Sequence, residues 1–185
     1  MSNSKEMAPA TSEIKAQGVL TDKGVKVTEK SNIDALCQRG YGTAEKDTLT
    51  LAFHEALYLV DRQMLVVKGR KGAEVDFQAL LHSYEAFDEN AWMHYMVYRD
   101  LRSRGYVVRE GIGAAIDFRI YERGAYGKET ASFLVLSMQE GQPLPMEGLS
   151  KALAQTGSLK RELILAAMNR RGEIVYYSVS PLTFR

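Results

Sequence analysis

The chain has 185 residues, a formal net charge of +1 and a hydrophobic content of 45%. This length allows one large domain or two small ones, and this composition is typical of a globular protein with ordinary buried cores. A single cysteine, Cys37, excludes an intramolecular disulfide framework. The sequence has neither a signal-peptide pattern nor an apolar run near the roughly 20 residues of a membrane span. We therefore expect a soluble, cytoplasmic protein without a membrane partner.

Charge is distributed unevenly along the chain. From residue 91 onward there are thirteen basic and nine acidic side chains, which leaves eleven basic and fourteen acidic for the first part. The second part thus carries a net charge of +4 and the first part −3. This asymmetry places any surface that binds a polyanion in the second part.

The first part alternates short strand and helix patterns. Residues 1–14 are polar, and we predict a disordered leader there. Two short strands follow around the turn at 22–24, and then a helix capped by Ser31 or Asn32. The remaining predicted elements are a strand at 48–51, an amphipathic helix from 52, a strand at 64–68 and a helix over 76–87. Together they predict a compact α+β domain over residues 15–86.

A second α+β domain is predicted over residues 87–185. Its first helix carries Tyr95, Tyr98 and Leu101 at helical spacing and stops at Gly105. Strands are predicted at 106–108, 117–121, 132–138, 162–168 and 173–180, with a helix over 146–157. This order predicts a mixed sheet with helices packed on it, so the fold class is α+β with two small domains.

A basic and aromatic hairpin opens the sheet of this second domain. A turn with two glycines joins its strands, and its rim carries Asp117, Arg119, Tyr121 and Arg123. Guanidinium and phenol groups at this density suit contact with RNA phosphates and stacking on bases.

The order of residues around this hairpin resembles a known family. The segments YRDLRSRGYVV at 98–108 and DFRIYERGAYGKE at 117–129 resemble the catalytic domain of archaeal tRNA-intron (splicing) endonucleases. The segment LTLAFHEALYLV at 49–60 resembles the N-terminal domain of the same family. The resemblance covers both predicted domains and implies that the second one is similar to restriction nucleases.

The resemblance also implies a substrate, a reaction and partners. The substrate would be the bulge-helix-bulge of precursor tRNA, and the chain would form a homo- or hetero-oligomer with endonuclease subunits. The reaction would need no metal and no cofactor: the ribose 2′-OH attacks the adjacent phosphate and leaves a 2′,3′-cyclic phosphate and a 5′-OH. It requires a base, an acid and a cation near the phosphorane, roles for which the family is thought to use Tyr, His and Lys.

Three positions of this sequence correspond to that catalytic set, and only the first keeps the family's residue. Tyr121 matches the tyrosine, whose phenol has an ordinary pKa of about 10 and needs nearby cations, such as Arg119 and Arg123, to act as a base. Thr130 stands where the family has its histidine, and a hydroxyl cannot donate a proton near pH 7. Arg161 stands in place of the lysine and keeps the charge with a different geometry.

Other positions concern contact with RNA. Tyr176 matches a position that stacks on a bulge base, whereas the arginine that would complete this sandwich is replaced by Ala154. The turn at 169–173, acidic in the family, carries two arginines here and would be repelled by the usual groove of a neighbouring subunit or would bind an acidic partner. The predicted RNA-binding residues are Arg119, Arg123, Lys128, Lys160 and Tyr176.

The sequence contains no pattern for a metal site. No Cys/His cluster suggests zinc. Asp117 could start the site of a metal-dependent nuclease, but the strand predicted at 132–138 lacks the carboxylate and lysine that such a site needs. The three histidines all lie on predicted helices, where partly buried structural roles are expected: His54, His82 and His94. A solvated strand tyrosine at Tyr121 and a solvated strand start at Arg161 remain the structural alternatives.

Three functions are compatible with these residues. The first is a structural or pseudocatalytic subunit that dimerises through the last strand and positions RNA for an active partner, which the loss of the proton donor favours. The second is an active tRNA-intron endonuclease with Tyr121 as base, Arg161 as phosphate stabiliser, and water or Thr130 in place of the acid. A third, an RNA-binding module unrelated to splicing, rests on the basic second part alone.

Overall fold

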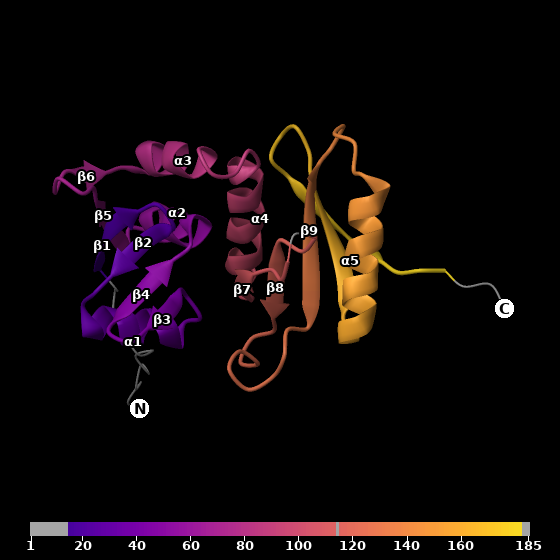
Figure 1. The fold of residues 1–185 in the computed structure, drawn as a ribbon, viewed down its shortest axis with the longest axis horizontal. Coiled ribbons are helices and arrows are strands. Elements are labelled where there is room, and N and C mark those ends of the chain that lie inside the picture. Colours follow the sequence, from indigo (N-terminus) through magenta and orange to yellow (C-terminus); the bar gives the residue numbers. More distant parts are fainter. Residues whose placement is uncertain (1–14, 114, 183–185) are drawn as a thin grey trace, which may run out of the picture.

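A computed structural model of the chain describes residues 15–113 and 115–182 (Figure 1). In this part of the chain it has five helices and two β-sheets, so the predicted α+β class with two small parts is confirmed. The leader predicted over residues 1–14 lies outside the described residues. Within them, no helix has both the length and the apolar character that crossing a membrane requires.

The N-terminal sheet has six strands in the order β3-β4-β2-β1-β5-β6. Only the β1–β5 pair is parallel, and the other neighbours are antiparallel. The elements are β1 (Ala16–Thr21), β2 (Gly24–Val27), α1 (Lys30–Gln38), β3 (Thr43–Glu45), β4 (Thr48–Leu51), α2 (Phe53–Asp61), β5 (Leu65–Lys68), β6 (Glu74–Val75) and α3 (Phe77–Glu85). The sequence did not predict β3 and β6, because strands of two or three residues are too short to show an alternating pattern.

Two details of these helices differ from expectation. The predicted cap of α1 is wrong, because Glu29 precedes the helix and its carboxylate accepts hydrogen bonds from Ser31 Oγ at 2.9 Å and Asn32 Nδ2 at 2.7 Å. Helix α2 is buried continuously from Phe53 to Leu59 rather than on one face. It packs against the N-terminal sheet, α3 and α4, so even its polar side chains are enclosed.

The C-terminal sheet has five strands in the order β11-β10-β9-β8-β7. The β9–β10 pair is parallel and the others are antiparallel, so the predicted mixed sheet is confirmed. The elements are α4 (Ala91–Ser103), β7 (Val107–Glu110), β8 (Phe118–Tyr121), β9 (Phe133–Gln139), α5 (Met146–Leu159), β10 (Glu162–Met168) and β11 (Ile174–Val179). Helices α4 and α5 cover opposite faces of this sheet (Figure 1).

Two apolar clusters follow from this arrangement. The larger one runs from the N-terminal sheet through α2 and α4 to one face of the C-terminal sheet, where Phe118 and Val135 belong to it. The smaller one lies between the other face and α5 and contains Ile116, Leu134 and Leu163. The two parts of the chain thus share one core, and the α5 face of the C-terminal sheet has its own.

A buried ion pair also joins the two parts. Arg109 of β7 donates to the Glu55 carboxylate of α2 at 3.0 Å, and the side chains are 13% and 4% exposed. Arg109 donates further to Gly40 O at 3.2 Å and Thr43 Oγ1 at 3.0 Å. Burial raises the pKa of Glu55, and the Arg109 charge opposes that rise. These contacts of Arg109 therefore fix β7, where the C-terminal sheet begins, against α2, β3 and the segment that follows α1.

A second polar contact fixes α4 to the start of β8. His94 Nδ1 lies 2.6 Å from Asp88, in the α3–α4 connection, and His94 Nε2 lies 3.5 Å from Asp117. Burial alone would lower the pKa of His94, but the hydrogen bonds and charges of Asp117 and Asp88 outweigh burial and raise it. Burial likewise opposes ionisation of Asp88, yet its contacts with His94 hold the Asp88 pKa below the ordinary value.

We expect this contact to make stability depend on pH. Because the folded-state pKa of His94 is raised, its contribution is complete below the unfolded-state value of about 6.5 and is lost as pH rises through the folded-state pKa. Because the Asp88 pKa is lowered, its contribution is complete above the unfolded-state value of about 3.9 and is lost as pH falls through the folded-state pKa. The measurement is urea unfolding between pH 5 and pH 9, where His94→Gln should remove the alkaline decrease.

The control is His82→Gln, since the His82 side chain is 90% exposed. This exposure also shows that the predicted partly buried role of His82 is wrong, whereas His54 is buried. The His82→Gln variant should keep the pH dependence of the unsubstituted protein. An equal alkaline decrease in His94→Gln would contradict the assignment.

Candidate active site

A depression of about 180 Å³ opens on the α5 face of the C-terminal sheet. It brings together Tyr121, Thr130 and Arg161, which come from β8, the β8–β9 connection and the start of β10. The residues that line it are Ile112, Arg119, Tyr121, Thr130, Ala131, Leu134, Leu159 and Arg161. All three residues that the sequence assigned to catalysis therefore meet in one place.

The alternation of β8 directs two of these side chains. Phe118 and Ile120 are buried in the large cluster on the α4 side. Because successive strand residues point to opposite faces, Arg119 and Tyr121 face the α5 side. The strand thus places a guanidinium and a phenol two residues apart on one surface.

The parallel pairing of β9 with β10 brings Thr130 and Arg161 together. Glu162 of β10 is in register with Phe133 of β9, so Arg161 lies beside the segment that leads into β9, which includes Thr130. Lys160 ends α5 in the left-handed conformation, with φ 53°, which turns the chain directly into β10. Arg161 Nη2 then donates to Thr130 Oγ1. The Arg161 guanidinium is therefore in direct contact with the Thr130 hydroxyl.

Among the described residues that line the depression are two arginines and no Asp or Glu, so its lining is cationic. Arg119 Nε donates to Glu110 O at 2.8 Å, and the Tyr121 ring meets Tyr126 edge-on with centroids 5.1 Å apart. In the described part of the chain, neither Arg119 nor Arg161 makes an ion pair with a carboxylate. Both guanidiniums can therefore bind a phosphate. None of the described residues that line the depression is a histidine, so the depression offers no imidazole as a proton donor.

The other predicted RNA-binding residues lie outside this depression. Arg123 extends over Gly105 at the end of α4, Lys128 is exposed on the β8–β9 connection, and Lys160 is exposed beside Arg161. Asp117 does not lie on the hairpin rim as predicted. Its side chain points inward and accepts a hydrogen bond from Ser137 N at 2.5 Å. These positions leave Arg119 as the one predicted RNA contact that lines the depression.

Tyr176 lies on the opposite face of the sheet. Its hydroxyl donates to Asp100 on α4 at 2.7 Å, and Arg104 lies 5.4 Å from the ring centroid. Burial, followed by this hydrogen bond, raises the pKa of Tyr176. The ring is therefore held against α4, and the structure does not bring it to Tyr121.

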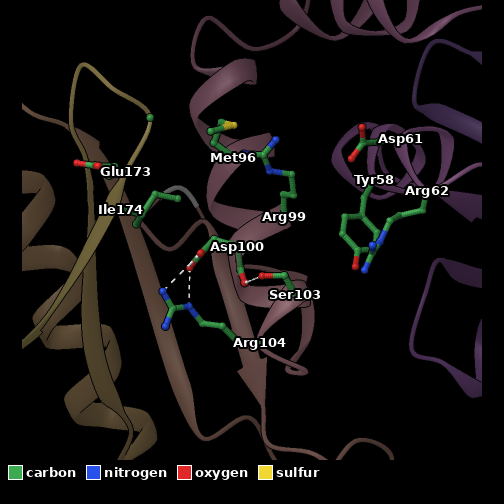
Figure 2. Close-up of a pocket in the computed structure, with 11 residues that line it drawn as sticks. Tyr58, Asp61, Arg62, Met96, Arg99, Asp100, Ser103, Arg104, Glu173 and Ile174 are labelled. Atoms are coloured by element: carbon green, nitrogen blue, oxygen red, sulfur yellow. Dashed lines mark hydrogen bonds and ion pairs between the residues drawn. The ribbon is translucent and has the colours of Figure 1, made fainter.

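A larger groove of about 500 Å³ adjoins this contact, and side chains of α2 and α4 face each other across it (Figure 2). It carries three arginines and three carboxylates, so their charges balance, and the Arg104–Asp100 pair at 2.7 Å neutralises two of them. The charged residues are Asp61, Arg62, Arg99, Asp100, Arg104 and Glu173. This balance favours the depression, rather than the groove, as the site for a phosphate.

Sequence reasoning missed the apolar residues Ile112 and Leu159, which line the depression and are 42% and 43% exposed. For each residue, the sequence contains a feature that could have indicated an exposed apolar side chain. Ile112 is an apolar residue between the two glycines of an exposed turn, and Leu159 follows the last polar residues of α5. In the same described residues, no group of His, Cys, Asp or Glu side chains could hold a metal ion.

Comparison with known proteins gives a consistent result. Residues 16–81 match the family described as tRNA intron endonuclease, N-terminal domain, and residues 91–176 match tRNA intron endonuclease, catalytic C-terminal domain. The chain is 31% identical to a tRNA-splicing endonuclease of Methanococcus vannielii over 163 residues, which cover 88% of this chain and 92% of that protein. Identity to the tRNA-splicing endonuclease of Pyrococcus horikoshii is 29% over 163 residues, covering 88% and 94%. A Methanosarcina acetivorans tRNA-splicing endonuclease is 32% identical over 152 residues, covering 81% of this chain and 42% of that protein.

Proposed function

The chain belongs to the tRNA intron endonuclease family, and from this premise we propose that it is a structural or pseudocatalytic subunit of a tRNA-splicing endonuclease. It binds the bulge-helix-bulge of precursor tRNA and positions it for a partner subunit with a complete catalytic set. One observation carries the proposal: Arg119, Tyr121, Thr130 and Arg161 line one depression, and none of the described residues that line it is a histidine.

The proposal follows from what metal-free RNA cleavage requires. A base removes the proton of the 2′-OH as its oxygen attacks the phosphorus, and the 5′ oxygen leaves with a proton from an acid. Tyr121 supplies a phenol for the first step, and Arg161 supplies charge for the phosphorane. Thr130 supplies no acid, and loss of general acid catalysis lowers a rate by about 10²–10⁴.

An active endonuclease with variant residues is the second candidate. The convergence of Tyr121, Thr130 and Arg161 favours it, because a purely structural subunit does not need these side chains to meet. In this alternative Tyr121 is the base, Arg161 stabilises the phosphate, and water or Thr130 protonates the leaving oxygen.

Assembly is proposed through the last strand. β11 is an edge strand of the C-terminal sheet, and its Val175 and Tyr177 side chains are 48% and 53% exposed. An exposed edge strand with apolar side chains is a template for pairing with another chain. The proposed domains, 15–86 and 87–185, meet in the connection between α3 and α4.

A cleavage assay without metal tests the function. The purified chain is incubated with a labelled bulge-helix-bulge RNA in chelator, alone and with a related subunit that has Tyr, His and Lys at the three positions. We expect binding with little cleavage by the chain alone, because the acid is missing, and more cleavage when both are present. Rapid cleavage by the chain alone would favour the active alternative.

The same RNA serves to test the phosphate contacts. Arg119→Ala and Arg161→Ala should each weaken binding and reduce the slope of log K against log salt by about 0.7–1, as loss of one phosphate contact does. The matched control is Arg70→Ala, because Arg70 is 72% exposed and pairs with Asp22 far from the depression. Unchanged affinity in both depression variants would contradict the RNA-binding assignment.

A further inference from the structure

The depression combines apolar and cationic side chains in one place. Ile112 and Leu159 have similar exposed fractions of 42% and 43%, whereas Leu134, which also lines the depression, is only 1% exposed. The same depression contains the guanidiniums of Arg119 and Arg161. Single exposed apolar residues are common on protein surfaces. What points to a ligand is that Ile112 and Leu159 lie in the same depression as two arginines that make no ion pair with a carboxylate in the described part of the chain.

Hydrogen bonds hold the two apolar residues in place. Gln155 Nε2 on α5 donates to Ile112 O at 2.8 Å and so fixes the β7–β8 turn to the helix. Leu159 lies one helical turn after Gln155, on the same side of α5. Gly111 N donates to Asp117 O at 2.8 Å and closes the base of the turn. Ile112 and Leu159 are therefore positioned by one helix.

We infer that Ile112 and Leu159 form an apolar seat for the nucleobase adjacent to the phosphate bound by Arg119 and Arg161. The inference rests on the proposed function, because it assumes that this depression binds RNA. A nucleotide has an apolar base face beside a negative phosphate, which is the complement of this surface. Apolar side chains hold bases that have left a helical stack, and bulge nucleotides cost little to unstack.

The size of the depression limits what it can hold. Its volume of about 180 Å³ is below the roughly 300–1,000 Å³ of pockets that enclose a ligand. The apolar seat therefore covers one face of a base and leaves the hydrogen-bonding edge outside. It should contribute affinity for an unstacked base with little preference among the four bases.

Paired substitutions in protein and RNA test the apolar seat. Binding of Ile112→Ala and Leu159→Ala is measured by fluorescence anisotropy with the bulge-helix-bulge RNA and with RNAs in which one bulge nucleotide at a time is abasic. For the unsubstituted protein, one abasic position should weaken binding roughly 5- to 160-fold, the range for loss of one base stacked on an aromatic side chain. In both variants that abasic penalty should fall to about 1–2-fold.

Met146→Ala is the matched control, since Met146 is an apolar residue of the same helix that is 72% exposed and lies outside the depression. It should keep the full abasic penalty, and circular dichroism confirms that all variants fold. Additive losses at every abasic position, or a change in self-association in place of RNA affinity, would overturn the apolar seat. If Arg119→Ala and Arg161→Ala weaken binding but Ile112→Ala and Leu159→Ala keep the full abasic penalty, only this inference fails. If the unsubstituted protein binds no RNA, the proposed function fails with it.

Discussion

Replacing Thr130 by histidine and Arg161 by lysine is expected to raise metal-free cleavage of a bulge-helix-bulge RNA by about 10²–10⁴-fold. An imidazole has an ordinary pKa of about 6.5 and can protonate the leaving oxygen near neutral pH. Thr130 is exposed and lines the depression with Tyr121, so the larger side chain has room. Lysine removes the guanidinium that now contacts position 130 and keeps the positive charge.

The measurement is single-turnover cleavage in chelator, with the products tested for a 2′,3′-cyclic phosphate. Adding Tyr121→Phe to the double variant is the control, because it removes the phenol that we propose as the base and should abolish the gain. If the unsubstituted chain cleaves rapidly and the double variant changes that rate by less than about threefold, the unsubstituted chain already has a working acid. The active endonuclease would then replace the structural subunit as the proposed function.

The fold was largely predictable because most elements have a clear period. The limits of β4 and β10 agree with the sequence prediction, since each is a short run of β-prone residues between turn signals. Failures occur where side-chain contacts decide the outcome. Ser31 and Asn32 are typical capping residues, yet both bind the Glu29 carboxylate, and helix α1 begins before them.

The candidate site was less predictable, because the sequence does not reveal which face of a strand meets which helix. The alternation of β11 places Tyr176 on the face opposite Val175 and Tyr177, and their burial agrees with this, since Tyr176 is partly buried and the other two are exposed. Only the structure shows that the Tyr176 face packs on α4, away from Tyr121. The meeting of Thr130 and Arg161 depends on the parallel β9–β10 register, which is a tertiary feature. The catalytic roles remain predictions that cleavage assays must test.

The burial of Glu55 shows the same limit and leads to the largest expected change in stability. In the sequence, Glu55 occupies a polar position of a helical pattern, where a solvated carboxylate is the ordinary expectation. In the structure, α2 is enclosed, and the carboxylate accepts hydrogen bonds from Gly42 N at 3.1 Å, Ala52 N at 3.0 Å and Arg109 at 3.0 Å. One side chain thus satisfies three donors at the junction of the two sheets.

Glu55→Ala is expected to lower the free energy of unfolding by about 3–5 kcal/mol, because it leaves the Arg109 charge largely buried without a partner. Urea unfolding at neutral pH measures this loss. Arg70→Ala is the control: it breaks the exposed Arg70–Asp22 pair, whose side chains are 72% and 77% exposed, and should cost no more than about 1 kcal/mol. In the double variant Glu55→Ala, Arg109→Met, part of the loss should be recovered, since no unpaired charge remains. Equal losses for Glu55→Ala and Arg70→Ala would show that water reaches Arg109, and the pair would then not fix β7 to α2.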